Sequence, residues 1–184
     1  MTPVPGSLHA DAVRVLEQWA APDAQQDALR RDYLEHLRAH PDGLDRGCLP
    51  GHLTASALVA GPEGRVLLTL HRRLGRWLQT GGHCEPGDAT LAKAALREAS
   101  EESGIAGLVV SDSPLRLDLH HVPCAGPGSS VAHLDVQWLA TAPAGAVEVI
   151  SEESIDLRWF APDALPEGVD ASVRALVGAA LQLD

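Results

Sequence analysis

The chain has 184 residues and carries 25 acidic against 14 basic side chains, a formal net charge of −11. This length supports one good core with a short appendage rather than two full domains. The acidic balance argues against binding to nucleic acid or to an anionic membrane, because such binding needs a basic surface. There is no signal-peptide pattern and no apolar stretch long enough to span a bilayer, so we expect a cytoplasmic protein. The three cysteines are odd in number and widely spaced, which predicts reduced thiols.

Two amphipathic helices are predicted at the start of the chain. Ser7 is a suitable N-cap for a helix over residues 8–20, and a second helix follows over residues 23–39. Both carry apolar residues at helical spacing. We expect residues 1–50 to form an N-terminal helical extension that packs on the core or helps a dimer to form.

From His52 onward the pattern changes to short apolar runs that alternate with turn residues. The expected strands cover residues 53–60, 65–71, 108–111, 115–122, 133–140 and 157–160. Helices are predicted over residues 91–103 and 171–183. Strands mixed with a few helices predict a compact α+β domain over residues 51–184, of the α/β/α sandwich type.

The helix over residues 91–103 carries three carboxylates on one strip of its surface. Glu98, Glu101 and Glu102 stand at i, i+3 and i+4, where like charges repel. They also lie in the last turns before Gly104, the expected C-cap, where the helix dipole disfavours acids by about 0.3–1 kcal/mol each. A solvated surface strip is the ordinary explanation. A bound Mg²⁺ or Mn²⁺ is the alternative, because hard carboxylate oxygens suit these ions and these ions bind phosphates.

The loop before this helix favours the metal. Gly81 and Gly82 allow the backbone to approach a metal or phosphate closely, and Glu85 and Asp88 add further acids. Arg97 is placed to pair with a loop carboxylate and hold it in position.

The loop and helix together resemble the Nudix box. That motif reads glycine, five residues, glutamate, seven residues, then Arg-Glu-hydrophobic-any-Glu-Glu-any-Gly-hydrophobic, and Gly82 and residues 97–105 match it. The chain departs from it in two ways: Asp88 stands in place of the first glutamate, and eight residues rather than seven separate it from Arg97. The longer loop leaves open whether Asp88 or Glu85 takes the supporting role of that glutamate.

The resemblance implies a Nudix-type α/β/α sandwich with a mixed sheet and a hydrolase that cleaves the pyrophosphate bond of a nucleoside diphosphate derivative or a related diphosphate. It implies that Glu98, Glu101 and Glu102 coordinate Mg²⁺ or Mn²⁺, with the Gly82 carbonyl as a further ligand. Arg97 would orient these groups. The substrate would be a small molecule, and a homodimer is expected because homodimers are frequent in the family.

The general base has several candidates. The resemblance allows Glu98 itself or an acid from a later loop, where Glu152 and Glu153 are favoured over Glu148. An exposed acidic turn before a strand is an equally good explanation of these later acids.

Four residues are candidates for substrate binding. Arg72 and Arg76 belong to the one local basic cluster and suit a phosphate, although exposed hairpin arginines need no function. Trp77 suits base stacking, but a core or rim aromatic is the commoner outcome. His83 lies beside the glycines, near the expected metal.

Two other functions remain open from the sequence. One is a non-catalytic, nucleotide-sensing Nudix module, which has less need for an intact acidic box. The other is an isoprenoid-diphosphate isomerase on the same fold, for which His83 and Cys84 would be a suitable pair.

A zinc site is a weaker hypothesis. It would draw on His120, His121, Cys124 and His133, whose spacing matches no common motif. His120 and His121 are neighbours that point to opposite faces of a strand, so at most one of them joins such a site.

Overall fold

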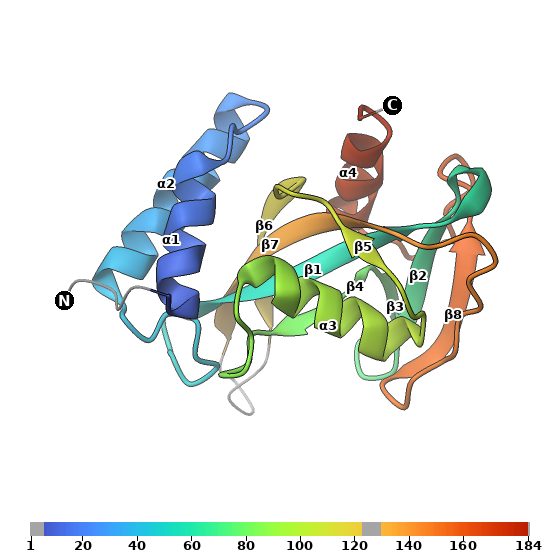
Figure 1. The fold of residues 1–184 in the computed structure, drawn as a ribbon, viewed down its shortest axis with the longest axis horizontal. Helices are drawn as coiled ribbons and strands as arrows, with labels where there is room; N and C mark the ends of the chain where they lie inside the picture. Colours follow the sequence, from blue (N-terminus) through green and yellow to red (C-terminus); the bar gives the residue numbers. More distant parts are fainter. Residues whose placement is uncertain (1–5, 123–129, 184) are drawn as a thin grey trace.

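The computed structural model describes residues 6–122 and 130–183. Its helices are α1 (Leu8–Gln18), α2 (Ala24–Ala39), α3 (Leu91–Ser103) and α4 (Ala171–Ala180), with a short 3-10 turn, η1 (Pro62–Gly64). Its strands are β1 (Gly51–Ala60), β2 (Val66–His71), β3 (Arg76–Leu78), β4 (Thr80–His83), β5 (Val109–Val110), β6 (Arg116–Val122), β7 (Val131–Thr141) and β8 (Ser154–Phe160). Figure 1 gives their arrangement.

The strands form one mixed, eight-stranded sheet around β1. β1 pairs in parallel with β7 along its whole length, from Gly51 opposite Ala132 to Ala60 opposite Thr141. It also pairs antiparallel with β2 and β4, while β7 pairs with β5 and β6, and β2 pairs with β3 and β8. The long β1–β7 ladder therefore brings residues near 52 and 133 side by side.

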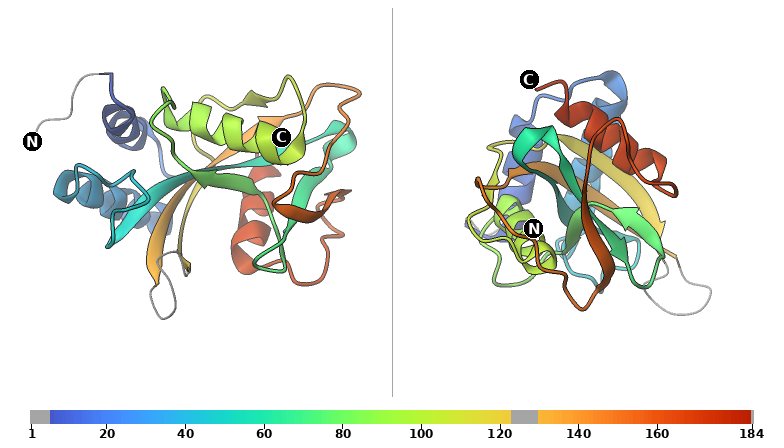
Figure 2. Two further views of the ribbon diagram at one scale, coloured as in Figure 1. Left: turned by 90° about the horizontal axis from the view of Figure 1, so that it is seen from below. Right: turned by 90° about the vertical axis from the view of Figure 1, so that its right-hand side faces the viewer.

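Helices cover both faces of the sheet, as Figure 2 shows for α3 on one side and α4 on the other. Alternate residues of β1 point to opposite faces, so Ala55 and Ala57 pack beneath α3 whereas Leu58 packs with the apolar side of α4. Small side chains on α3, including Ala95 and Ala99, let this helix lie close to the strands. The predicted α/β/α sandwich is confirmed.

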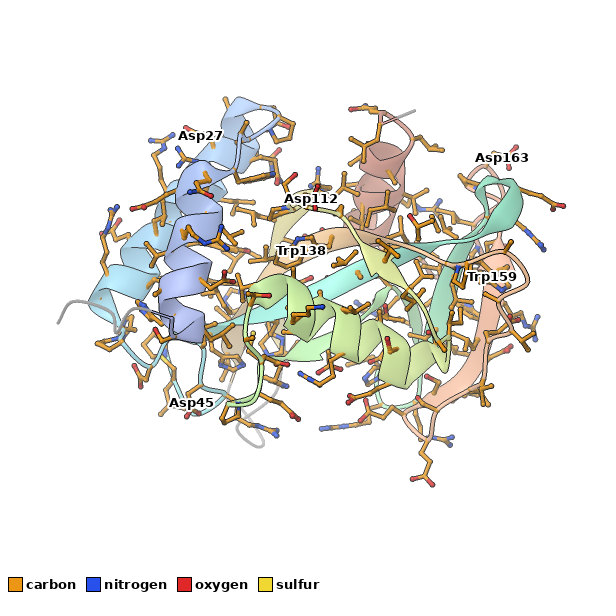
Figure 3. The ribbon with its side chains drawn as sticks, in the orientation of Figure 1. Asp27, Asp45, Asp112, Trp138, Trp159 and Asp163 are labelled. Carbon is orange, nitrogen blue, oxygen red and sulfur yellow. The ribbon has the colours of Figure 1, made fainter. Side chains whose placement is uncertain are left out.

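Trp138 of β7 is 1% exposed and belongs to the larger core cluster beneath α3. Figure 3 places it in the middle of the molecule, whereas Trp159 lies on β8 at the opposite end from α1 and α2. The core is therefore continuous from the central strands to the N-terminal helices, which contribute Leu16, Tyr33 and Leu37 to the same cluster.

The N-terminal helices pack against the edge formed by β6. The side-chain amide of Gln26 accepts a hydrogen bond from the Leu117 amide at 2.7 Å and donates one to the Leu117 carbonyl at 3.1 Å, as a neighbouring strand would. The Tyr33 hydroxyl donates to the Asp118 carbonyl at 2.7 Å. The two Gln26 bonds pair the Leu117 backbone groups, which an edge strand otherwise leaves free. The predicted division of the chain at residue 50 stays a prediction.

Helix α1 also contacts the start of α3. The carboxylate of Asp11 is buried and accepts a hydrogen bond from the Leu91 amide at 2.8 Å. A negative charge at the first turn of a helix stabilises it through the exposed amides and the helix dipole. The extension thus helps to fix where α3 begins.

Several predicted boundaries are wrong. The first helix ends at Gln18, α4 ends at Ala180, and β8 begins at Ser154, three residues before the predicted strand. The sequence indicated no strand over β4, because two glycines have low strand propensity and only pairing with β1 makes this segment extended. No helix among the described residues has both the length and the apolar character needed to cross a bilayer.

Candidate active site

Local signals mark both ends of α3. Thr90 is the N-cap and accepts a hydrogen bond from the Lys93 amide, and the helix ends at Gly104, which adopts a left-handed conformation with φ of 66°. A Cβ at this position would lie 2.6 Å from the Cβ of Val149, so glycine is required both by the turn and by the packing. The predicted helix over residues 91–103 is confirmed.

The three glutamates of α3 differ in exposure. The side chain of Glu101 is 61% exposed and that of Glu98 15%, whereas Glu102 is 7% exposed and its carboxylate lies near the Gly81 amide. Burial, together with the charges of Glu98 and Glu153, raises the pKa of Glu102 to about 8. Burial also raises the pKa of Glu98, although the neighbouring Arg97 opposes this.

Arg97 ties the loop to the helix. Its Nε and Nη2 donate to the two carboxylate oxygens of Asp88 at 3.1 and 3.0 Å, and Nη2 also donates to the His83 carbonyl at 2.9 Å. Its Nη1 donates to Glu98 at 3.0 Å and to Glu101 at 3.1 Å. Fork-shaped pairing of this kind fixes orientation as well as charge.

Asp88, rather than Glu85, is the loop acid that Arg97 holds. Glu85 lies 4.0 Å from Arg97 and is largely exposed, and its amide donates to Asp88 at 2.8 Å. Burial raises the pKa of Asp88, but the hydrogen bonds from Arg97 and from the Glu85 amide outweigh it and lower that pKa. The longer loop therefore still brings its second acid to the arginine.

The backbone of Gly82 lies directly against Glu98. A Cβ on Gly82 would stand 2.8 Å from the Cδ and one carboxylate oxygen of Glu98. Nearby, Oε2 of Glu102 is buried and has no hydrogen-bond partner within the described ranges. Several carboxylates with unused lone pairs, gathered beside a bare stretch of backbone, are a donor set that fits a hard divalent cation.

The loop before β8 brings one more acid to this cluster. Glu153 raises the pKa values of both Glu98 and Glu102 through its charge, which places its carboxylate near theirs. Arg72 holds this loop: its amide donates to the Glu153 carbonyl at 2.9 Å, and its guanidinium donates to the carbonyls of Glu152 and Ser154 at 2.9 and 2.8 Å.

The later acids therefore differ in their surroundings. Glu148 accepts a hydrogen bond from the Trp159 indole at 2.8 Å. Glu152 accepts a hydrogen bond from Arg72 through its backbone carbonyl at 2.9 Å. Of the three, Glu153 has the placement expected of a group that acts with α3.

The four predicted substrate-binding residues lie in different places. Arg72 is used to hold the loop before β8, and Arg76 is exposed on β3. Trp77 packs edge-on against Phe160 at 5.0 Å between ring centroids and borders the core cluster beneath α4. The imidazole of His83 lies among other histidines rather than beside the carboxylates of α3.

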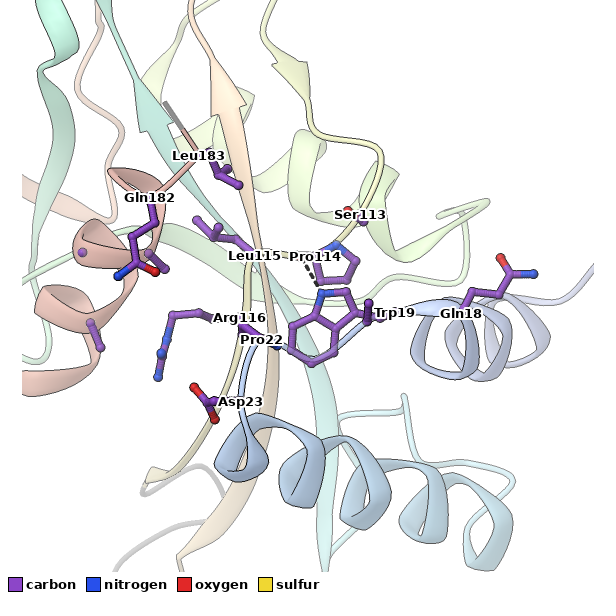
Figure 4. A pocket seen from close by; sticks show the side chains of 14 residues that line it. Gln18, Trp19, Pro22, Asp23, Ser113, Pro114, Leu115, Arg116, Gln182 and Leu183 are labelled. Atoms are coloured by element: carbon purple, nitrogen blue, oxygen red, sulfur yellow. Dashed lines mark hydrogen bonds between the residues drawn. The ribbon is translucent and has the colours of Figure 1, made fainter.

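A surface cavity of about 750 Å³ lies elsewhere, between the α1–α2 connection, the start of β6 and the end of α4 (Figure 4). Trp19 forms part of its wall and donates through its indole nitrogen to the Pro114 carbonyl at 2.7 Å. The lining includes no residue of α3 or β4. This cavity therefore does not contribute to the carboxylate cluster.

Comparison with known proteins agrees with the geometry. A family model described as the NUDIX domain matches residues 50–177. The fold is similar to that of a NUDIX-family hydrolase from Clostridium perfringens, with 22% identity and a TM-score of 0.58 over 72% of this chain and 98% of that one. An Ap4A hydrolase of C. elegans has 18% identity and a TM-score of 0.57, over 71% of this chain and 96% of that one. A MutT NUDIX hydrolase from Burkholderia pseudomallei has 25% identity and a TM-score of 0.55, over 69% of this chain and 95% of that one.

The family match covers most of the chain and includes both the glycine loop and the whole of α3. The shared fold and the arrangement of Arg97 with the helix carboxylates point in the same direction. The chain therefore belongs to the Nudix hydrolase family.

Proposed function

We propose that this protein is a divalent-metal-dependent hydrolase that cleaves the pyrophosphate bond of a nucleoside diphosphate derivative or a related diphosphate. The observation that carries the proposal is the carboxylate cluster on α3, which stands against the bare backbone of Gly82 and is oriented by Arg97. An acidic protein needs a cation to hold a phosphate, and this carboxylate cluster is suited to bind that cation.

Glu98, Glu101, Glu102 and the Gly82 carbonyl would hold Mg²⁺ or Mn²⁺. When bound, the cation offsets the negative charge of the substrate phosphates and makes a water molecule easier to deprotonate. Arg97 keeps the Glu98 and Glu101 carboxylates in place, since it donates to both of them. Burial restricts the Glu102 side chain, which is 7% exposed.

A carboxylate of this cluster is proposed to take the proton from the attacking water. Glu98 is one candidate, because burial raises its pKa and so makes it a better base. Glu153 is the other, since its charge acts on the same site from a separate loop. Arg76 on the exposed strand β3 is proposed to contact a distal phosphate or the group attached to it.

The experiment is a hydrolysis screen of the purified protein with Mg²⁺ or Mn²⁺. The panel covers nucleotide sugars, dinucleoside polyphosphates, nucleoside triphosphates and ADP-ribose, with products identified by chromatography. The C. elegans protein of similar fold is named an Ap4A hydrolase, which is why dinucleoside polyphosphates are included. We expect at least one compound to be cleaved at its pyrophosphate bond.

Glu102→Gln should abolish this cleavage, and Glu17→Gln, which alters an exposed glutamate of α1, should leave it unchanged. Release of no phosphate product by the parent protein would contradict the proposal. Isomerisation of an isoprenoid diphosphate without phosphate release would favour the isomerase instead. Thermal protection by a nucleotide without turnover would favour the sensing module. The homodimer stays a prediction that light scattering tests.

A further inference from the structure

Neighbouring strands place three histidines on the sheet face that points away from α3. His52 of β1 and His133 of β7 are direct partners in the parallel ladder. His83 of β4 is the partner of Thr54, which lies two residues from His52 on β1 and so on the same face. Residues that stand far apart in the sequence are thus gathered by the pairing of β4, β1 and β7.

The three imidazoles form a triangle. The distances between ring centroids are 5.0 Å for His52 and His83, 4.8 Å for His52 and His133, and 5.1 Å for His83 and His133. One nitrogen of each ring lies within 4.8 Å of the other two. The centre of a triangle of that size is about 2.8 Å from each corner, and a zinc–nitrogen bond is about 2.0–2.1 Å long. Small side-chain rotations that move each nitrogen inward by about 0.7 Å bring all three to zinc-bonding distance.

Two ring nitrogens of the triangle are buried and lack a hydrogen-bond partner among the described residues. Nε2 of His52 and Nε2 of His83 have no hydrogen-bond partner in the described part of the chain, and His52 is fully buried. Buried polar atoms are nearly always bonded, so orphaned ones call for an explanation. Nδ1 of His52 lies 3.5 Å from the Cys48 carbonyl. A histidine that donates from one nitrogen to a carbonyl and offers the other as a lone pair is the usual form of a metal ligand.

We propose that His52, His83 and His133 form a binding site for a transition-metal cation, with Zn²⁺ as the ion that three imidazoles suit. Imidazole nitrogen is a ligand for zinc and related metals, whereas Mg²⁺ prefers oxygen. Three protein ligands leave one position of a tetrahedral zinc open. The site is distinct from the carboxylate cluster, because it lies on the other side of β4 from the place where Gly82 meets Glu98.

This site differs from the weaker zinc hypothesis that the sequence raised. It keeps His133 but replaces the other members of that set. His120 lies beside His133, with 5.4 Å between ring centroids, and is bonded to Asp118 at 2.9 Å rather than joining the triangle. His121 is on the opposite face of β6, and Cys124 lies outside the described residues.

The test is the zinc content of the full-length protein, measured after treatment with a chelator and dialysis against micromolar Zn²⁺ in excess Mg²⁺. We expect one Zn²⁺ per chain, with affinity reduced about 100-fold or more by His52→Ala, His83→Ala or His133→Ala. The matched control is His121→Ala, an exposed imidazole on the opposite face of the neighbouring strand, and it should bind as the parent does. Circular dichroism checks that each variant is folded.

A second group of potential ligands, formed by His40, Asp42 and Cys48, requires its own control. Cys48→Ser should retain the metal, and Co²⁺ in the parent protein should give the visible bands of a four-coordinate ion without a thiolate charge-transfer band. Because this spectrum is taken on the parent protein, it shows whether a thiolate binds the metal even where a histidine variant fails to fold.

The proposal is overturned by an absence of bound zinc, by equal zinc content in all three histidine variants and the parent, by loss of zinc from Cys48→Ser, or by a thiolate band.

Discussion

Replacement of Gly82 by alanine should separate activity from stability. The added Cβ would lie 2.8 Å from the Glu98 carboxylate, and an ordinary contact of 3.4 Å requires that carboxylate to move by about 0.6 Å. The end of a glutamate side chain can make this movement at little cost. Alanine also lowers the conformational entropy of the unfolded chain, which stabilises the folded state by about 0.4–1 kcal/mol. The free energy of unfolding should therefore change by less than about 1 kcal/mol.

The same displacement should be costly for hydrolysis. A shift of this size in a catalytic group lowers the rate by about 10- to 100-fold, which corresponds to about 1.4–2.7 kcal/mol in the activation free energy. The assay compares kcat/KM for pyrophosphate cleavage with the denaturant midpoint of the same preparation.

Gly81→Ala is the matched control. Its Cβ would lie 2.6 Å from the Cα of Ser56, and this backbone atom cannot move aside as a side chain can. We expect Gly81→Ala to lower the free energy of unfolding by about 1–3 kcal/mol. Full activity in Gly82→Ala, or equal destabilisation by the two substitutions, would refute the role given to the Gly82–Glu98 contact.

Three further predictions concern other contacts of the site. Asp88→Ala should lower kcat/KM by about 10-fold or more, because Asp88 holds Arg97 in place. Glu85→Ala should change kcat/KM by less than about 3-fold, since Glu85 lies 4.0 Å from Arg97. Steady-state kinetics of both variants test this. Metal-free protein should become less stable as pH rises from about 4.5 to about 8, because the folded state keeps a proton on Glu102 that the unfolded chain has lost. Denaturant titrations in chelator at several pH values should show that the free energy of unfolding falls less steeply with pH in Glu102→Gln. Asp11→Ala should destabilise the protein by about 1–3 kcal/mol, measured in the same way, because it leaves the amide at the start of α3 unpaired.

The parts of the site that the sequence predicts are those set by local chemistry. The predicted helix over residues 91–103 agrees with α3, whose end is set by Gly104, the C-cap that the sequence already indicates. The pairing of Arg97 with a loop acid is also local, although the choice of Asp88 over Glu85 needed the folded loop.

The features that the sequence does not predict depend on contacts between distant segments. The unequal exposure of Glu101 and Glu102 arises where α3 meets β4, and the packing of Trp77 against Phe160 depends on the pairing of β2 with β3 and β8. The histidine triangle depends in the same way on the β1–β7 ladder, and no spacing in the chain indicates that His52 belongs to it.

The role of the α3 glutamates as metal ligands is tested by measuring pyrophosphate hydrolysis as a function of Mn²⁺ concentration for the parent protein, Glu98→Gln and Glu102→Gln. We expect hydrolysis by the parent protein to need the cation and to saturate with it. Each variant should lose about 100-fold or more of the rate at the same cation concentration. Hydrolysis that persists in chelator, or variants whose metal dependence matches that of the parent, would contradict the assignment of the α3 glutamates as the metal site.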